Sequence, residues 1–331
     1  KQMKRYAEKR ERSSRRFCRP HRMELLQGDI KYGPDIRTTE GELIKTYLSS
    51  LIDDHSRYIV QSEFYDNQGQ EIVEDTFHKA VLKAGKFDCA YLDRGSQYTA
   101  GHLQKACAKL GIRILHAKPG ACESKGKIEK FHQRVDQFIA EVRVAHVHSV
   151  EELNRRWKVF LEQEYQKEAH EGIREYYKSY GVEVAACGIT PEQEWLRDER
   201  GLVFLDVSVV AEAFRHREKR RIDGAGCFSF RGRKYEASTA FANLEVEIAY
   251  DPMDTDTVTV YCSGAEPVAA RRMEIGAYAA KKPEVPLGMT KARPESSRLL
   301  DALEKKYKED HRQMAEALSF GDYVKEASGN V

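Results

Sequence analysis

Three acidic residues stand where they could hold divalent metal ions. Asp29 lies near the end of a short apolar segment, MELLQGDI, and Asp93 directly follows a second one, FDCAYL. A stretch of 35 residues separates Asp93 from Glu129, which lies at the start of a segment with helical apolar spacing. Carboxylate oxygens are the ligands that Mg²⁺ and Mn²⁺ prefer. Two such ions can stabilise both the attacking and the leaving oxygen of a phosphoryl transfer.

Strand-like and helix-like segments alternate in an order that would bring these acids together. The expected strands are 23–32, 45–53, 58–64, 87–92 and 112–117, and the expected helices are 70–83, 101–110 and 124–143. On the last helix, Glu129 lies beside a stripe that contains Ile128, Phe131 and Val135. Crossovers through helices require some parallel strand pairing, while the opening strands form antiparallel hairpins. The sequence therefore predicts a mixed α/β sheet flanked by helices.

Other acids compete for the same roles. Asp53 and Asp54 lie in the polar stretch DDHS between two predicted strands, where turn chemistry explains them. Glu123 precedes Glu129 by six residues and lies close to the start of the helix, where a carboxylate interacts favourably with the helix dipole. We therefore favour Asp29, Asp93 and Glu129, with the other three as alternatives.

Three motifs resemble those of the DDE transposase and retroviral integrase superfamily. They are GDI, YLDRGSQYT and KGKIEKFHQ, and the resemblance covers roughly residues 20–200. It implies a ribonuclease H-like fold and carries the metal-binding catalytic triad over to Asp29, Asp93 and Glu129. It also implies that Mg²⁺ or Mn²⁺, as two ions per active site, supports cutting of DNA element ends and transfer of the freed 3′-hydroxyl into target DNA. The alternatives are a catalytically silent DNA-binding or assembly protein and a plain nuclease of the same fold.

Several polar side chains are candidate DNA contacts. Lys and Arg neutralise phosphates, and a catalytic carboxylate in such a fold must lie beside the bound backbone. Gly95 and Gln97 follow Asp93 and could supply donors to the site. The candidate contacts are Lys125, Lys127, Lys130 and His132 around Glu129, and Arg231, Arg233 and Lys234 farther along the chain. The competing interpretation for each is an ordinary solvated surface residue.

The chain divides into five regions. Residues 1–22 form an arm with ten Lys or Arg against two acidic residues, which is either a linker or a phosphate contact. Residues 23–148 form the core and 149–207 a helical extension of it. Residues 208–265 alternate apolar and polar residues in short strands and resemble the small C-terminal β-barrel of Mu-type transposases. Residues 266–331 form a linker and a C-terminal helix, which either packs on the surface or contacts a partner.

Composition limits the cellular setting. The 331 residues are 41% hydrophobic, enough for sizeable cores, and the net charge of +2 is too small to indicate a nucleic-acid partner by itself. Seven cysteines without a CxxC motif favour a reducing compartment, and no second pair completes a zinc site with Cys18 and His21. No apolar run approaches the ~20 residues of a membrane span.

The resemblance completes these expectations. It implies a bacterial, cytoplasmic and nucleoid-associated protein that forms a homo-oligomer on DNA, with a possible accessory protein at the C-terminal tail. No helix-turn-helix module is visible, and the chain starts at Lys1. We therefore expect an upstream DNA-binding segment that this sequence lacks.

Overall fold

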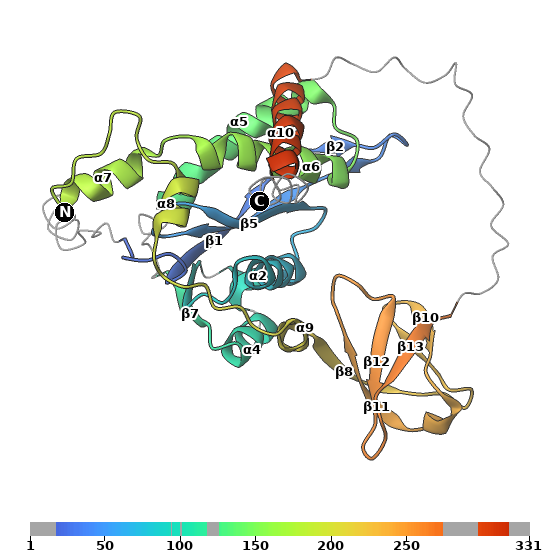
Figure 1. Ribbon diagram of the computed structural model, residues 1–331. Coiled ribbons are helices and arrows are strands. Elements are labelled where there is room, and N and C mark those ends of the chain that lie inside the picture. Colours follow the sequence, from blue (N-terminus) through green and yellow to red (C-terminus); the bar gives the residue numbers. More distant parts are fainter. Residues whose placement is uncertain (1–17, 94, 100, 118–125, 274–296, 318–331) are drawn as a thin grey trace, which may run out of the picture.

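The computed structural model describes residues 18–93, 95–99, 101–117, 126–273 and 297–317. It consists of an α/β core and a β-barrel, which helix α9 (Val207–Phe214) joins (Figure 1). The helix C-terminal to the barrel, α10 (Arg298–Ala317), lies on the core again.

A five-stranded mixed sheet forms the centre of the core. Its strands are β1 (Leu25–Tyr32), β4 (Tyr47–Asp53), β5 (Ile59–Tyr65), β6 (Cys89–Leu92) and β7 (Arg113–His116). They lie in the order β5-β4-β1-β6-β7. The β1–β4 and β4–β5 pairs are antiparallel, whereas β1–β6 and β6–β7 are parallel. The mixed sheet expected from the sequence is therefore confirmed.

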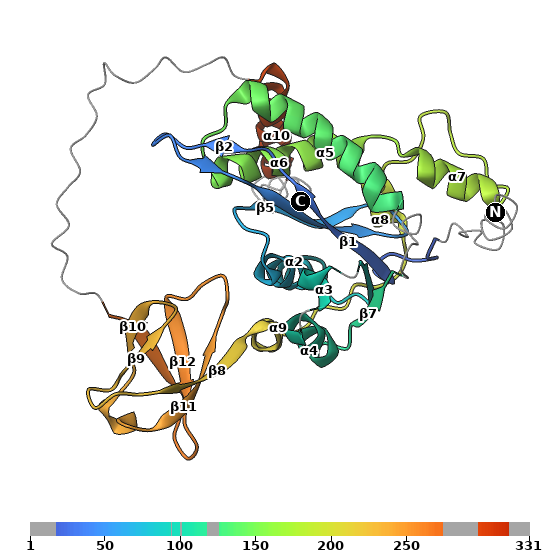
Figure 2. The same cartoon turned by 180° about the vertical axis from the view of Figure 1, so that it is seen from behind.

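One face of the sheet is covered by α2 (Gln70–Ala84), α3 (Ser96–Thr99), α4 (Gly101–Lys109) and α9 (Figure 2). Apolar residues at helical spacing on α2, among them Val73 and Phe77, are completely buried against Leu26 of β1. Leu103 of α4 and Phe214 of α9 belong to the same core cluster. This face therefore connects the centre of the sheet to the segment that leads into the barrel.

The other face is covered by α5 (Gly126–Ala145), α6 (Val150–Gln163) and α10 (Figures 1 and 2). Trp157 of α6 lies at the centre of this layer, with Phe138 of α5 at a ring-centroid distance of 4.9 Å. Its indole Nε1 donates to Ser62 Oγ at 3.0 Å, which ties α6 to β5. The side chain of Ser149 accepts a hydrogen bond from the Glu152 backbone N–H at 3.1 Å and thereby caps the start of α6.

Shorter elements complete the core. They are the small hairpin β2 (Ile36–Arg37) and β3 (Leu43–Ile44), the 3₁₀ turn η2 (Tyr165–Lys167), α7 (Glu171–Ser179) and α8 (Pro191–Arg197). Helix α8 starts with a capping box in which Thr190 and Gln193 bond each other's backbone N–H. Trp195 of α8 stacks on Tyr58 at 4.8 Å, so the helical extension is fixed to the edge of the sheet.

The barrel is a nearly closed antiparallel sheet of six strands. They are β8 (His216–Arg221), β9 (Cys227–Phe230), β10 (Arg233–Glu236), β11 (Glu245–Tyr250), β12 (Thr257–Tyr261) and β13 (Val268–Arg272), with a 3₁₀ turn η3 (Thr239–Phe241). Their order is β8-β11-β12-β13-β10-β9. Alternate residues such as Phe230, Tyr235 and Ile248 fill the interior. Because β13 pairs with both β12 and β10, the barrel extends beyond residue 265.

Helix α10 packs against α6 on the core. Leu300 and Leu303 are buried in the core cluster that contains Trp157. Ser297 Oγ donates to Glu141 Oε2 of α5 at 2.7 Å, and Arg155 of α6 pairs with Glu304. The expected C-terminal helix is therefore present and attached to the core. Among the residues that the structure describes, no helix has the length and apolarity needed to cross a membrane.

Candidate active site

Asp29 and Asp93 lie at the same level of the sheet on neighbouring strands. The parallel pairing of β1 with β6 places Leu25 opposite Cys89 and Gln27 opposite Tyr91. Two residues farther along each chain, the same register brings Asp29 level with Asp93, which directly follows β6. Neighbouring strands lie about 4.8 Å apart. The two aspartates are therefore adjacent because of backbone pairing, and both are partly exposed.

Asp29 also faces helix α5. His132 Nδ1 of α5 lies 3.9 Å from Asp29 Oδ2, and Lys31 Nζ pairs with Asp136 Oδ1 at 2.9 Å. Asp29 and Lys31 are two residues apart on β1, and their partners His132 and Asp136 are four residues apart on α5, in the same order. The two elements therefore run in the same direction. The two spans are similar in length, because a strand rises about 3.3 Å per residue and a helix about 1.5 Å. His132, predicted to be a surface residue, a DNA contact or a residue that supports the metal ligands, lies next to Asp29 with its side chain 14% exposed.

The turn after β6 holds Asp93 in place. The Gly95 backbone N–H donates to Asp93 Oδ1 at 2.8 Å, and His116 Nδ1 of β7 hydrogen-bonds the Asp93 carbonyl at 2.9 Å. A methyl group on Gly95 would lie 2.8 Å from Gln97 Oε1 and 3.0 Å from Asp93 Oδ1. Gly95 and Gln97 therefore lie beside the carboxylate, as expected of residues that line the site.

Glu129 is the member of the predicted triad that the structure does not bring into contact with the others. It lies on the first turn of α5, three residues before His132, and is exposed. Within the described ranges, no group of three or more His, Cys, Asp or Glu side chains is arranged to hold a metal ion. The donor chemistry nevertheless fits a hard divalent cation, because Asp29 and Asp93 offer only oxygen ligands at one point of the sheet.

Lys127, expected to contact DNA, points into the protein. Its ammonium group donates to the Asp54 carbonyl at 2.9 Å and to the Asp54 carboxylate, and its side chain is 18% exposed. Burial and the nearby charge of Arg57 lower the pKa of Lys127, against the opposing effect of Asp54. Its observed role is to attach the start of α5 to the β4–β5 turn.

The remaining candidates on α5 differ in how far the structure describes them. Lys130 is exposed and lies 3.8 Å from Glu171 Oε2 of α7, an exposed pair that leaves it accessible to phosphate. Lys125 and the alternative acid Glu123 lie outside the described residues.

The acids considered as rivals of Asp29 are buried in the β4–β5 turn. Asp53 Oδ1 accepts from the Met23 backbone N–H at 2.8 Å, and Asp53 Oδ2 accepts from the Ser56 backbone N–H and hydroxyl. Asp54 accepts from Arg19 and Gln27 in addition to Lys127. Both aspartates are completely inaccessible to solvent. They organise the turn and offer no open position for a metal ion or a phosphate.

A charged network around this turn was not anticipated from the sequence. His55 Nε2 lies 3.0 Å from Glu194 Oε1 and 3.5 Å from Asp198 Oδ2. The two terminal guanidinium nitrogens of Arg57, Nη1 and Nη2, each lie 3.7 Å from Cys18 Sγ. Burial lowers the pKa of His55, but hydrogen bonds with Cys18 and Glu194 outweigh it and raise the pKa to about 10. The acids of this network come from segments more than a hundred residues away, so local sequence patterns contained no signal for it.

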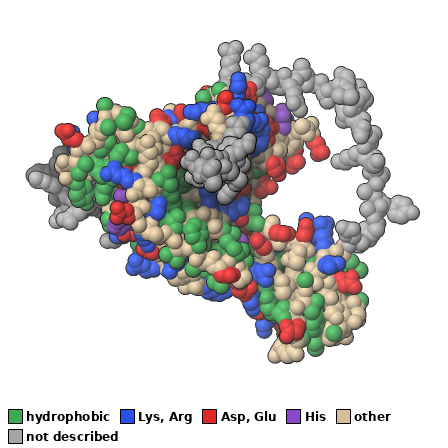
Figure 3. Space-filling model, in the orientation of Figure 1, with side chains coloured by type: hydrophobic (Ala, Val, Ile, Leu, Met, Phe, Trp, Pro, Cys, Tyr) green, Lys and Arg blue, Asp and Glu red, His purple; other side chains and the backbone are tan. Residues whose placement is uncertain are grey.

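The barrel residues expected to contact DNA are on its surface but partly engaged. Arg231 lies over the Tyr250 ring at 5.1 Å, and Arg233 lies 3.4 Å from Asp256 Oδ1. Lys234 is exposed. On the face shown in Figure 3, basic and acidic side chains are mixed over the barrel, in keeping with ion pairs such as Arg217–Glu247. Such mixed charges are expected if these cations are ordinary solvated surface residues.

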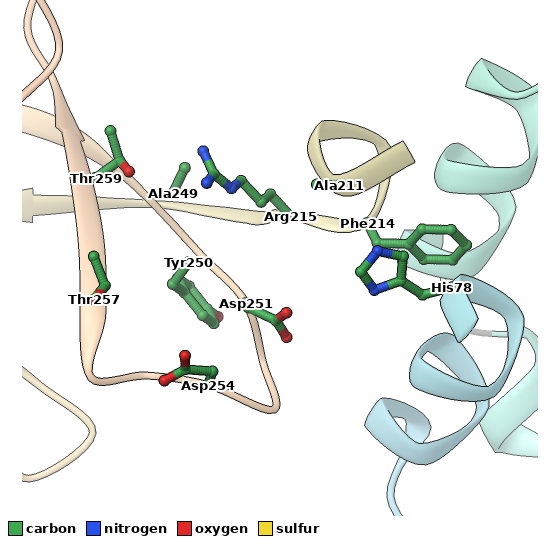
Figure 4. A pocket seen from close by; sticks show the side chains of 10 residues that line it. All are labelled: His78, Ala211, Phe214, Arg215, Ala249, Tyr250, Asp251, Asp254, Thr257 and Thr259. Atoms are coloured by element: carbon green, nitrogen blue, oxygen red, sulfur yellow. The ribbon is translucent and has the colours of Figure 1, made fainter. Parts of the chain in front are cut away.

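The junction between barrel and core contains a buried ionisable pair and a pocket. His216 of β8 pairs with Glu74 of α2, and the ring of His102 stacks on His216 at 4.0 Å. Figure 4 shows the pocket between His78 and Phe214 on the core side and the β11–β12 turn, with Asp251 and Asp254, on the barrel side. It has a volume of about 210 Å³ and none of the three predicted catalytic acids lines it.

Comparisons with known proteins agree with this architecture. Residues 19–122 match the family model of the integrase core domain, and residues 211–266 match that of the Mu transposase C-terminal domain. The transposase of transposon Tn552 from Staphylococcus aureus is 23% identical over 248 residues, which cover 67% of this chain and 48% of that protein. The chain thus spans about half the length of this relative.

The solved structures that the comparison matched include two retroviral integrase catalytic cores. The core domain of HTLV-2 integrase in complex with magnesium has a TM-score of 0.39 and 13% identity, covering 53% of this chain and 97% of that one. The core domain of BIV integrase has a TM-score of 0.38 and 15% identity, covering 53% and 94%. The two matched families and the Tn552 relative confirm the resemblance seen in the motifs: residues 19–122 are similar to integrase core domains, and residues 211–266 are similar to Mu transposase C-terminal domains.

Proposed function

We propose that the protein is a DDE-type DNA transposase. It would cut the ends of a mobile element in a metal-dependent reaction and join the freed 3′-hydroxyl to target DNA. The observation that carries this proposal is the register of β1 and β6, which sets Asp29 and Asp93 side by side within the matched integrase core domain. Glu129, on the helix that contacts Asp29 through His132, is the third acid of the proposal.

The proposed cofactor is Mg²⁺ or Mn²⁺, held by Asp29, Asp93 and Glu129. When bound, two such ions would activate the attacking oxygen and stabilise the leaving oxygen. The protein itself holds Asp93 through the Gly95 N–H and places His132 beside Asp29. Lys130 and the exposed cations of the barrel are the proposed phosphate contacts. The proposed partners are element-end and target DNA and further copies of the same chain, with the C-terminal tail as the proposed site of an accessory protein.

Branched DNA provides a direct test of the chemistry. An oligonucleotide that mimics the joined product lets the reverse reaction be followed without knowledge of the element ends. In Mg²⁺ or Mn²⁺, the wild-type chain should resolve the branch, while Asp29→Asn and Asp93→Asn should lower the rate by about 100- to 1,000-fold, in line with the loss of a group that stabilises transition-state charge. DNA binding by fluorescence anisotropy should change little. Branch resolution by Asp93→Asn at the wild-type rate would contradict the mechanism.

The same assay decides between the two glutamates. Glu129→Gln should be as inactive as the aspartate variants, and Glu123→Gln should retain activity. The opposite result would transfer the role of third metal ligand to Glu123.

The products of the reaction also separate the alternative functions. A chain that hydrolyses linear DNA but never transfers a strand would be the plain nuclease, and one that binds DNA without any metal-dependent product would be the silent binding protein.

A further inference from the structure

Tyr98 has a buried hydroxyl group for which the described residues provide no hydrogen-bond partner. The residue lies on α3, five positions after Asp93, and only 3% of its surface is exposed. Its ring belongs to the core cluster that contains Leu26 of β1 and Leu92 of β6. A buried hydroxyl that lacks a partner is unfavourable, and phenylalanine would fill the same space without this penalty. The hydroxyl therefore calls for an explanation other than packing.

The position of the ring near Asp93 suggests that explanation. A methyl group on Gly95 would lie 3.0 Å from Asp93 Oδ1 and 3.5 Å from Cδ2 of the Tyr98 ring, so carboxylate and ring flank the same point. Burial, followed by the negative charges of Asp29 and Asp93, raises the pKa of Tyr98 well above its ordinary value. A tyrosine hydroxyl is protonated at neutral pH and can donate a hydrogen bond.

We propose that Tyr98 is a positioning residue of the metal site, whose hydroxyl donates a hydrogen bond to an oxygen of the cation-loaded Asp29–Asp93 pair. That oxygen belongs to one of the two carboxylates or to a water molecule on the ion. Hydrogen bonds to ligating carboxylates orient them and strengthen metal binding. The inference rests on the proposed function, because it assumes that Asp29 and Asp93 hold a divalent cation.

Tyr98→Phe removes the oxygen and retains the ring, so it tests the hydroxyl alone. The variant should bind Mg²⁺ about 10-fold more weakly than the wild type in isothermal titration calorimetry, the effect typical of residues that orient metal ligands. Its melting temperature without metal should not fall, since no existing hydrogen bond is lost. Terbium luminescence excited through tyrosine should drop in Tyr98→Phe, because Tyr98 would lie close to an ion at this site.

Tyr65 provides a matched control. It is also a buried tyrosine beside an acid, but its hydroxyl donates to Asp75 Oδ2 at 2.6 Å. Tyr65→Phe should therefore lower the melting temperature and leave Mg²⁺ affinity and terbium luminescence unchanged. The two variants are expected to show opposite patterns, which a general weakening of the fold would not produce.

The outcomes separate this inference from the proposed function. If the wild type binds Mg²⁺, Asp93→Asn does not, and Tyr98→Phe binds as tightly as the wild type, the role of Tyr98 is refuted and the metal site stands. If neither the wild type nor Asp93→Asn binds Mg²⁺, Mn²⁺ or terbium, both proposals are refuted. Equal luminescence from wild type and Tyr98→Phe, with loss in Asp93→Asn, would place the ion away from Tyr98 and also refute the inference.

Discussion

Asp29 and Asp93 reach the same level of the sheet through backbone hydrogen bonding, whereas the position of Glu129 depends on how helix α5 packs. The helix is attached at Asp29 through His132 and at Asp54 through Lys127. Lys127 and His132 thus hold helix α5 in position, although as single residues they resemble surface cations. For each of these two side chains, the aspartate beside it therefore determines its role.

His55 makes stability depend on pH at the residue scale. Its folded-state pKa of about 10 exceeds the ordinary value of about 6.5, so the folded protein binds this proton more tightly than the unfolded chain. The resulting stabilisation is complete below about pH 6.5 and is lost as the pH rises through about 10. Because one pKa unit corresponds to about 1.4 kcal/mol, the change should amount to a few kcal/mol.

Urea unfolding between pH 6 and 10 measures this effect. The free energy of unfolding of the wild type should fall over this range by more than that of His55→Gln. His311→Gln, which alters an exposed histidine on α10, should follow the wild type. Parallel curves for wild type and His55→Gln would show that the proton on His55 does not contribute to folding.

Residue types and spacing identified the adjacent pair of acids, Gly95 as a backbone donor beside Asp93, and the rivals Asp53 and Asp54 as turn residues. The sequence could not reveal that Lys127 bonds Asp54 or that His55 meets Glu194. These contacts join segments 73 and 139 residues apart, and a charge pattern along one element has no information about its distant partner.

At the scale of elements, the close contact between β1 and its neighbours depends on Gly28. A methyl group on Gly28 would lie 2.5 Å from Leu92 Cδ2 and 3.0 Å from Leu51 Cδ2. A side chain here would push apart the strands that place Asp29 beside Asp93. Gly28 therefore contributes to the site through packing, without any chemistry of its own.

Gly28→Ala should destabilise the protein by about 1–3 kcal/mol, the usual range for overpacking a core, and should lower branch resolution more than this loss of stability explains. Gly28→Ala combined with Leu92→Val should recover part of both, because the shorter side chain makes room. Gly126→Ala is the control, since a methyl group there would meet nothing within 4 Å. Additive effects of Gly28→Ala and Leu92→Val would show that the two residues do not compete for space.

Elements with a clear apolar period were predictable, and two others were not. The strands of the core and helices α2, α5 and α6 follow the spacing of their buried residues. Helix α9 was missed because VSVVAEAF is an almost continuous apolar run, typical of a buried strand. Asp206, whose side chain accepts from the Ser208 N–H at 2.8 Å, was the available capping signal. The β2–β3 hairpin, with two residues per strand, is too short to show a period.

At the scale of the whole molecule, the barrel meets the core through His216, Glu74 and His102. His216 and Glu74 are 142 residues apart in sequence, so the arrangement of the two units could not be predicted. The barrel follows α9, which packs against α2 and α4, whereas α5 with Glu129 lies on the opposite face of the sheet (Figure 1). A DNA-binding role of the barrel in the same complex therefore requires a duplex that passes from one face of the core to the other, or a second copy of the chain.

The salt dependence of DNA binding measures the contribution of the barrel. Each phosphate contact contributes about −0.9 to the slope of log K against log salt concentration. Lys234→Gln should flatten the slope by about 0.9, and Arg233→Gln by less, because Asp256 already offsets its charge. The triple replacement of Arg231, Arg233 and Lys234 should flatten it by roughly 2–3 if all three contact phosphates.

Lys308→Gln, on the exposed surface of α10, is the matched control and should leave the slope unchanged. An unaltered slope in the triple variant would identify the barrel as a structural or protein-binding unit. Sequence preference should not change in any of these variants, because phosphate contacts do not read bases.

Helix α10 gives the molecule an unusual mechanical layout. The barrel lies between α9 and α10 in the chain, and both helices are attached to the core, so the barrel is an insertion and not a terminal appendage. A pulling force applied at the C-terminal end of α10 would be borne first by the Lys167–Asp310 pair, which is nearest that end, and then by the Arg155–Glu304 pair and Leu303, and would pass into η2 and α6. Any partner that grips this helix would therefore strain the α/β core while the barrel remains unloaded.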